Sequence, residues 1–257
     1  MSYKILEIDP YLKEFEQDIN LRMDAYKKKK KELLKSSKKL VDFANGHLFF
    51  GFHRTEEGWV YREWAPAAEG MYLTGDFNGW DTYGCPMERK EDGIFEVYLK
   101  GENALVEGQK VQAIVVHQGE TLRRIPTYAT RVVQDKNTYM WCAEIEETFK
   151  DYPWTDDGFK TAKTPFIYEC HIGMAQDKYD VGTYEEFTRL TLPRIKEAGY
   201  NTIQIMAVME HPYYGSFGYQ VSNFFEAASR YGRSEELKTL INTAHEMGIT
   251  VLLDVVH

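Results

Sequence analysis

The sequence predicts a multidomain protein with an N-terminal helix, an all-β immunoglobulin-like sandwich, and then the first three β/α units of a (β/α)8 TIM barrel. Three observations lead to this prediction. Apolar residues recur at helical steps from Pro10 to about Asn45, short β-rich segments follow as far as Ile145, and strand and helix patterns then alternate. The predicted helical segment, sandwich, linker and barrel start cover residues 1–45, 46–148, 149–163 and 164–257.

The helical segment has one apolar stripe. Its members recur every three or four residues: Leu12, Phe15, Ile19, Met23, Tyr26 and Leu33. A run of lysines, residues 27–31, lies inside this pattern. We interpret the run as a solvated helix face rather than a membrane anchor, because no lipidation motif accompanies it.

The sandwich is predicted from short strands that are separated by Gly, Asn, Asp or Pro. The β-rich segments read "LFFGFHR", "WVYREWAP", "GMYLTGDF", "GIFEVYL" and "KVQAIVVH". Short strands at regular spacing with turn residues between them are typical of a β-sandwich of about 100 residues.

The C-terminal part alternates between strands and helices, which is typical of a parallel sheet. Strands are predicted at three places, residues 166–173, 202–208 and 250–256. Thr183 and Glu186 form a capping-box pattern at the start of the first helix, and Pro193 predicts a kink within it. Ser234 is predicted to cap the second helix.

Polar residues near the strand ends favour a barrel over an open sheet. They occur in pairs at the ends of the successive strands: Glu169 and His171, Glu210 and His211, Asp254 and His257. The C-terminal strand ends of a (β/α)8 barrel converge on one face, where active sites are built. No glycine-rich phosphate fingerprint follows the first strand, which disfavours a dinucleotide-binding sheet.

Two chemistries are compatible with such a rim. One is a metal-dependent hydrolase. Such an enzyme normally has two histidines together on the first strand as metal ligands, whereas "ECH" contains one. The other is carbohydrate chemistry, in which groups such as His211 hold sugar hydroxyls and aromatic rings stack on the apolar sugar faces. The loop "HPYYGSFGYQ", residues 211–220, carries four aromatic rings and favours the carbohydrate interpretation.

Composition excludes several other classes. The net charge is −9, from 31 basic and 40 acidic residues, so we expect no nucleic-acid partner. The three cysteines have no zinc or disulfide spacing, and no window predicts a signal peptide or a membrane span. We therefore expect a cytoplasmic protein with no membrane partner and no bound metal.

The C-terminal motifs resemble a known family. "PFIYECHIG", "MEHPYYGSFGYQ" and "LLDVVH" closely resemble the start of the catalytic barrel of 1,4-α-glucan (glycogen/starch) branching enzymes of the eukaryotic type. These enzymes belong to glycoside hydrolase family 13, the α-amylase clan. Upstream, "YREWAPAAEGMYLTGDFNGWD" resembles the family 48 carbohydrate-binding module that precedes the barrel in such enzymes. The resemblance implies that the partner is an α-glucan such as glycogen, amylose or amylopectin, and that no cofactor is needed.

The resemblance also implies roles for individual residues. Tyr219 would stack beneath the sugar before the bond being cut, and Asp254 would organise the hydrogen bonds around that sugar. His257 matches the fourth position of the signature "DVVxxH". In the module, the matching surface-glucan residues are Trp64 and Pro66, with Asp92 and Gly93 on the other side of the groove and Trp80 of "FNGW" as a further candidate. The lysine that some relatives carry after this pair is Ile94 here.

The family's catalytic nucleophile, acid/base residue and third carboxylate arise on later barrel strands, so we expect none of them in this chain. The expected function is the N-terminal part of a glucan-branching enzyme, with no catalysis by these 257 residues alone. Two alternatives remain, a non-enzymatic glycogen-binding module and a debranching hydrolase of the same clan.

Overall fold

The computed structural model describes residues 3–35, 37–146 and 152–256, and the chain separates into two compact units, Met1–Phe49 and Phe50–His257. The first unit is helical. Its α-helices are α1 (Ile5–Ile8), α2 (Glu16–Leu33) and α3 (Leu40–Phe43), and its 3-10 helices are Pro10–Phe15 and Gly46–Leu48. No helix in the described part of the chain is both long enough and apolar enough to cross a membrane.

The helix α2 is shorter than the apolar stripe predicts. Regular α-helix begins at Glu16, because the preceding residues form a 3-10 turn in which the Asp9 carboxylate accepts a hydrogen bond from the Tyr11 N–H at 3.1 Å. The lysines at 27–31 are exposed, and Lys29 pairs with Glu32 at 2.9 Å. The prediction of a solvated basic face is confirmed.

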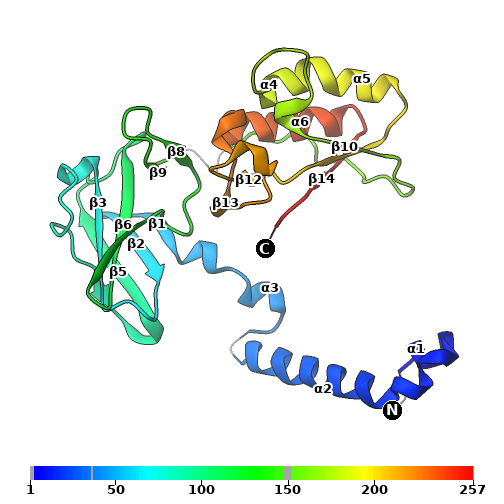
Figure 1. Cartoon of the computed structure of the whole chain (residues 1–257), viewed down its shortest axis with the longest axis horizontal. Coiled ribbons are helices and arrows are strands. Elements are labelled where there is room, and N and C mark those ends of the chain that lie inside the picture. Colours follow the sequence, from blue (N-terminus) through cyan, green and yellow to red (C-terminus); the bar gives the residue numbers. More distant parts are fainter. Residues whose placement is uncertain (1–2, 36, 147–151, 257) are drawn as a thin grey trace. The chain divides into compact units, whose positions relative to one another are not determined.

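The second unit begins with two antiparallel sheets that form the sandwich (Figure 1). One has the order β1-β2-β5-β4, with bounds Gly51–Thr55, Gly58–Trp64, Ile94–Lys100 and Glu88–Arg89. The other has the order β3-β6-β9-β8, with β7 also paired to β6. Its strands are β3 (Gly70–Gly75), β6 (Lys110–His117), β7 (Glu120–Arg124), β8 (Val132–Gln134) and β9 (Trp141–Glu144).

The sandwich core explains why the predicted segments became strands. Alternate residues of β2, β3 and β6 point inward, and Tyr61, Leu73 and Val111 are fully buried between the sheets. Two short 3-10 helices, Asp76–Asn78 and Glu91–Gly93, connect the strands. The predicted segments overlap β1, β2, β3, β5 and β6, whereas β4, β7, β8 and β9 were not predicted.

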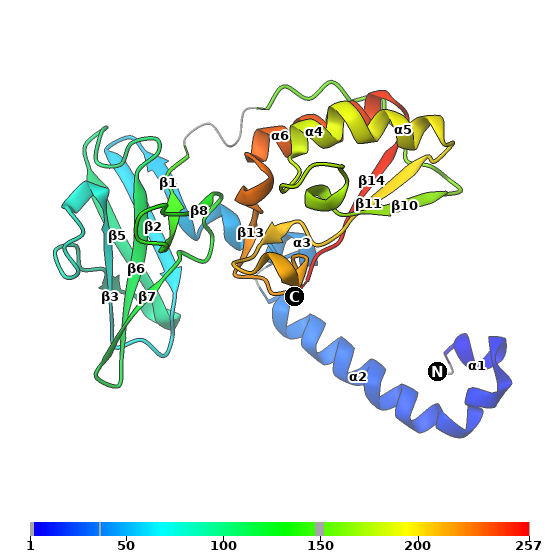
Figure 2. The ribbon, with the colours of Figure 1, turned by 45° about the horizontal axis from the view of Figure 1, so that its top comes forward.

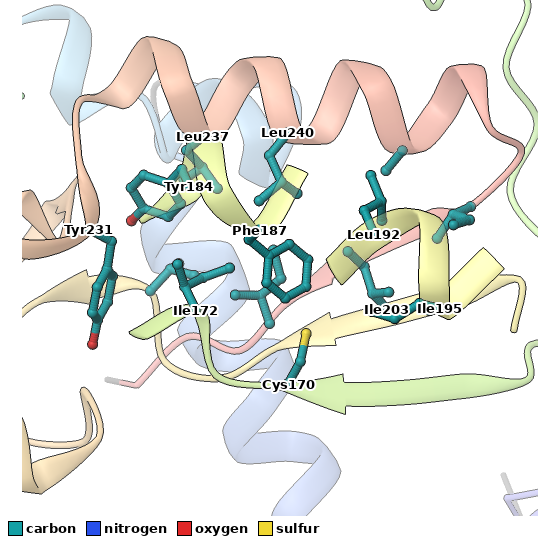
Figure 3. Close-up of a cluster of buried hydrophobic side chains, with 14 of the residues drawn as sticks. Cys170, Ile172, Tyr184, Phe187, Leu192, Ile195, Ile203, Tyr231, Leu237 and Leu240 are labelled. Atoms are coloured by element: carbon teal, nitrogen blue, oxygen red, sulfur yellow. The ribbon is translucent and has the colours of Figure 1, made fainter. Parts of the chain in front are cut away.

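The β/α part contains a parallel sheet with the order β10-β11-β14, bounded by Ile167–Cys170, Thr202–Ile205 and Thr250–Leu253. Helices α4 (Tyr184–Glu186), α5 (Leu192–Glu197) and α6 (Ser234–Glu246) lie on one face of this sheet (Figure 2). Figure 3 shows the apolar layer between them, to which Phe187, Leu240 and Ile203 all belong. The predicted strand–helix alternation and the start of a barrel are therefore present.

The helix ends confirm one predicted cap and correct the other. The Thr183 hydroxyl accepts from the Glu186 N–H at 3.1 Å, and the Glu186 carboxylate accepts from the Thr183 N–H at 3.0 Å, which completes the predicted capping box. Ser234, however, is the first residue of α6 rather than its cap. The cap position is Arg233, whose N–H donates to the Glu236 carboxylate at 2.7 Å.

The first helix also changes its winding before Pro193. Residues Phe187–Thr191 form a π-helical turn between α4 and α5. A proline lacks an N–H and crowds the preceding turn, so a wider turn at this point accommodates it. The predicted irregularity is confirmed.

The second predicted strand, residues 202–208, was too long. β11 ends at Ile205, and the chain then forms β12 (Met209–Glu210), which pairs antiparallel with β13 (Asn223–Ala227) outside the parallel sheet. Three 3-10 helices complete this region: Ile172–Met174, Tyr214–Ser216 and Ser229–Tyr231. Glu210 and His211 are therefore not at the end of the second parallel strand, as the sequence had suggested.

Candidate functional site

The loop between β12 and β13 brings Tyr219 to Asp254, which lies at the C-terminal end of the parallel strand β14. Asp254 directly follows β14, and its N–H donates to the Ile205 carbonyl at 3.1 Å, which fixes its backbone beside β11. The Tyr219 hydroxyl donates a hydrogen bond to Asp254 Oδ2 at 2.7 Å. The Tyr219 side chain remains 44% exposed, so part of its ring is open to a ligand. We call this pair the strand-end site.

Asp254 also changes the acidity of Tyr219. Its carboxylate accepts the phenolic hydrogen bond and lies close to where the phenolate charge would form, which raises the pKa of Tyr219 to about 12. Tyr219 therefore loses its proton only at higher pH than an ordinary tyrosine does.

Replacing Asp254 with asparagine is expected to lower the pKa of Tyr219 toward the ordinary tyrosine value of about 10. The change removes the negative charge while keeping a side chain of the same shape. NMR titration of the chain with ¹³C-labelled tyrosine measures this shift. Asp180→Asn is the control, because Asp180 has no part in the Tyr219 shift. An unchanged Tyr219 titration in Asp254→Asn would show that the two side chains are not paired in solution.

His211 lies beneath the loop rather than on its surface. The side chain is fully buried, and its Nδ1 lies 2.9 Å from the Met209 carbonyl while its Nε2 lies 3.3 Å from the Tyr231 hydroxyl. The carbonyl only accepts, so Nδ1 carries the proton and Nε2 accepts from Tyr231. The Tyr231 oxygen in turn accepts from His171 Nε2 at 3.1 Å. The geometry gives His211 a role in supporting the loop.

Glu210 and His171, which lie close to His211, are also held by hydrogen bonds inside the protein. Glu210 is fully buried and accepts from the His211 N–H, the Ser229 N–H and the Ser229 hydroxyl at 2.8, 2.8 and 2.6 Å. Burial and the nearby His211 lower the pKa of His171 below its usual value. Glu169 lies on the sheet and accepts from Gln204 at 3.0 Å. His257 lies outside the described residues.

The sandwich carries a second candidate site, which we call the sandwich site. It consists of Trp64, Pro66, Asp92 and Gly93, and the structure brings all four together. The Trp64 indole N–H donates to the Asp92 carbonyl at 2.9 Å, while 59% of the side chain stays exposed. The ring is therefore held by its edge and open on its surface.

Gly93 makes this arrangement possible. Its φ is +77°, and a Cβ added there would lie 2.4 Å from the Cα of Pro66. Asp92 also has a positive φ, of +56°. A tight turn with a glycine thus lets the two segments approach closely.

Trp80 lies in a different environment. It is half-buried, has a φ of +65°, and donates from its indole N–H to Asp76 Oδ1 at 2.9 Å. It lines a cavity of about 260 Å³ that also includes Lys110 and Asp135, which are paired at 2.6 Å. None of the residues that line this cavity belongs to the sandwich site.

Some supporting residues were not found from the sequence. Tyr231 and Ser229 hold His171, His211 and Glu210 in place, but the segment "SRYG" matches no motif that would have identified them. Within residues 3–35, 37–146 and 152–256, no group of three His, Cys, Asp or Glu side chains could hold a metal ion.

Comparison with known families identifies two domains along the chain. Residues 49–129 match carbohydrate-binding module 48 (isoamylase N-terminal domain), and residues 175–257 match the alpha amylase catalytic domain. The first match contains the sandwich site, and the second contains the strand-end site.

Individual relatives agree with these matches. The chain is 41% identical over 262 residues to a 1,4-alpha-glucan-branching enzyme of Equus caballus, covering 99% of this chain and 37% of the relative. It is 44% identical over 264 residues to the enzyme of the same name from Emericella nidulans, covering 98% and 38%. The chain thus spans less than two-fifths of the length of these curated relatives.

A solved structure supports the fold. The catalytic module of a multi-modular, glycogen-degrading pneumococcal virulence factor superposes with a TM-score of 0.64 at 23% identity, covering 89% of this chain and 38% of that module. At this identity the likeness concerns the fold alone.

Proposed function

Because the chain is a homologue of the 1,4-alpha-glucan-branching enzymes over nearly its whole length, we propose that it binds α-glucan and forms part of an enzyme that makes branches in it. The observation that carries the proposal is the hydrogen bond between Tyr219 and Asp254 at the C-terminal strand ends. An exposed aromatic ring locked to a carboxylate offers a stacking face and a hydrogen-bond acceptor to the same sugar.

The proposed reaction cuts an α-1,4 bond and transfers the released chain to a 6-hydroxyl. A retaining mechanism of this kind needs a carboxylate nucleophile and a carboxylic acid about 5–5.5 Å apart. We assign neither role to a residue of this chain. Tyr219 would stack on the sugar that becomes attached to the nucleophile, and Asp254 would accept hydrogen bonds from its hydroxyls. The reaction requires neither a metal nor an organic cofactor.

The sandwich site supports glucan binding apart from catalysis. Trp64 offers an open ring face, Pro66 and Gly93 shape the surface beside it, and Asp92 fixes the ring edge. A glycogen-binding module without catalysis is therefore the second candidate for the chain on its own. We further propose a cytoplasmic location, because Cys85, Cys142 and Cys170 are all free thiols, which suits a reducing compartment.

Substituting Trp64 with alanine is expected to weaken glucan binding about 10-fold, because the side chain supplies the largest open ring of the sandwich site. Co-sedimentation of the 257-residue chain with glycogen measures the effect. Tyr179→Ala is the matched control, since Tyr179 is a fully exposed aromatic residue in the β/α part. Equal binding by Trp64→Ala and the wild type would refute the sandwich site. Incubation of the wild-type chain with amylose tests the expectation that these 257 residues alone make no branches, which the appearance of α-1,6 linkages would overturn.

A further inference from the structure

A pocket of about 460 Å³ lies within the second unit, between the sandwich and the antiparallel strand pair β12–β13, which we call the arm. Trp64 and Arg124 line it from the sandwich, and Ser222, Asn223 and Phe224 line it from the arm. We call it the junction pocket. Its volume falls in the range typical of ligand sites, which is about 300–1,000 Å³.

The arm is fixed against the sandwich at this point. The Asn223 side chain is buried and donates to the Pro126 carbonyl at 3.2 Å, and the Phe225 ring stacks on Tyr128 with centroids 4.4 Å apart. Successive side chains of a strand point to opposite faces, so Phe224 is directed away from the Phe225–Tyr128 contact. These contacts hold Phe224 at the pocket, where its side chain is 48% exposed.

The pocket has aromatic surfaces at its edge and an apolar floor. Trp64 and Phe224 supply the two large exposed rings, while Ala65, Val115 and Ile125 contribute apolar surface between them. The exposed Ser222 hydroxyl adds a polar group at the rim, although it also donates to the Glu210 carbonyl at 3.2 Å. Pyranose rings combine apolar C–H faces with hydroxyl edges, so this lining suits a sugar chain.

The charged groups of the pocket are Arg123, Arg124 and Glu63, and each is already held by contacts within the protein: Arg124 donates to the Arg123 carbonyl at 2.9 Å. The Arg123 guanidinium already donates to Gln112 at 3.1 Å and to Thr82 at 3.2 Å. The Glu63 carboxylate lines the same pocket, accepting from the Tyr61 hydroxyl at 2.8 Å, and would repel an anion. A neutral ligand binds without displacing these contacts.

We propose that the junction pocket holds the continuation of a glucan chain that is bound at Trp64, with Phe224 as a further stacking residue. The inference rests on the proposed function, because it takes α-glucan as the ligand. It adds a contact from the β/α part of the chain to a surface that belongs to the sandwich. A glucan long enough to pass Trp64 would therefore touch both parts at once.

The test compares short and long ligands. Affinities for maltotriose and maltoheptaose are measured by calorimetry with wild-type chain, Phe224→Ala, Phe224→Trp and Tyr179→Ala. Phe224→Ala is expected to weaken maltoheptaose binding about 5-fold and to leave maltotriose binding unchanged, since one stacking contact is lost. Phe224→Trp, which restores a ring, is expected to recover the affinity for the longer ligand, and Tyr179→Ala to behave as wild type.

The outcomes separate the inference from the proposed function. If Phe224→Ala binds both ligands as the wild type does, the junction pocket is not part of the glucan path, while glucan binding itself stands. If Phe224→Ala weakens both ligands equally, the effect is a general disturbance of the surface and the inference fails. If the wild type binds neither ligand, the proposed glucan binding fails, and with it the inference.

Discussion

Replacing Glu226 with glutamine is expected to stabilise the chain by about 3 kcal/mol at pH 8 and by much less at pH 4.5. Glu226 is 4% exposed, and the backbone N–H of Val132 and the charge of Arg131 only partly offset the burial of its carboxylate. Burial, followed by the charges of Glu210 and Glu146, raises the pKa of Glu226 to about 10.

The sign of this stability change follows from the difference in bound protons between the folded and the unfolded chain. The folded chain keeps the Glu226 proton up to about pH 10, whereas the unfolded chain loses it near the ordinary glutamate pKa. The stability contributed by this proton is fully present below the unfolded pKa and is lost as the pH rises toward 10. Glutamine keeps the shape without the titration, so it removes this loss. Arg131, whose charge partly offsets the burial of Glu226, remains paired with Glu144 at 2.7 Å.

Thermal unfolding of Glu226→Gln and wild type between pH 4.5 and 8.5 measures the effect, which corresponds to about 6–12 °C at pH 8. Glu186→Gln is the control with the opposite sign. The ion pair with Lys178 and the hydrogen bonds of the capping box lower the pKa of Glu186 to about 2, so its contribution is present at neutral pH and is lost as the pH falls toward 2. A Glu226→Gln chain that is no more stable than wild type at pH 8 would show that Glu226 is ionised in the folded state.

The elements with strong local patterns were predicted correctly. The three parallel strands and the Thr183 cap depend on contiguous apolar residues and on a pair three residues apart. The strand β7 was missed because four of its five residues are exposed, so it shows no alternation of apolar and polar residues. Arm strands β12 and β13 depend on pairing across a 12-residue loop, and β12 has only two residues.

A motif places some candidate residues near one another, whereas the burial of others depends on contacts that are distant in the sequence. Tyr219 and Asp254 come together as the resemblance implied. His211 and Glu210 lie in the same stretch of sequence, but their burial depends on Tyr231 and Ser229, about 20 residues further on. Nothing in the local pattern distinguishes an exposed rim residue from one that supports the rim. Three-dimensional contacts were needed to separate Tyr219 from His211.

The backbone next to Tyr219 is constrained, and Gly218→Ala is expected to destabilise the chain by about 2–4 kcal/mol. Gly218 has a φ of +91°, and an added Cβ would lie 2.1 Å from the Ala207 carbonyl oxygen. Ala207 belongs to the segment that leaves β11, so neither side can move without disturbing the sheet. The loop would have to shift, and Tyr219 would shift with it.

Gly79→Ala separates this clash from the general effect of a left-handed backbone. Gly79 has a φ of +64°, but an added Cβ there would have no atom within 4 Å, so the substitution is expected to cost only about 1 kcal/mol. Chemical unfolding of both variants measures the difference. NMR titration of Tyr219 then reports on the site, because separation from Asp254 would lower the pKa of Tyr219 from about 12 in Gly218→Ala and leave it unchanged in Gly79→Ala. If the two variants are equally stable and Tyr219 titrates alike in both, close packing of Gly218 on Ala207 does not position Tyr219, and the hydrogen bond to Asp254 must do so alone.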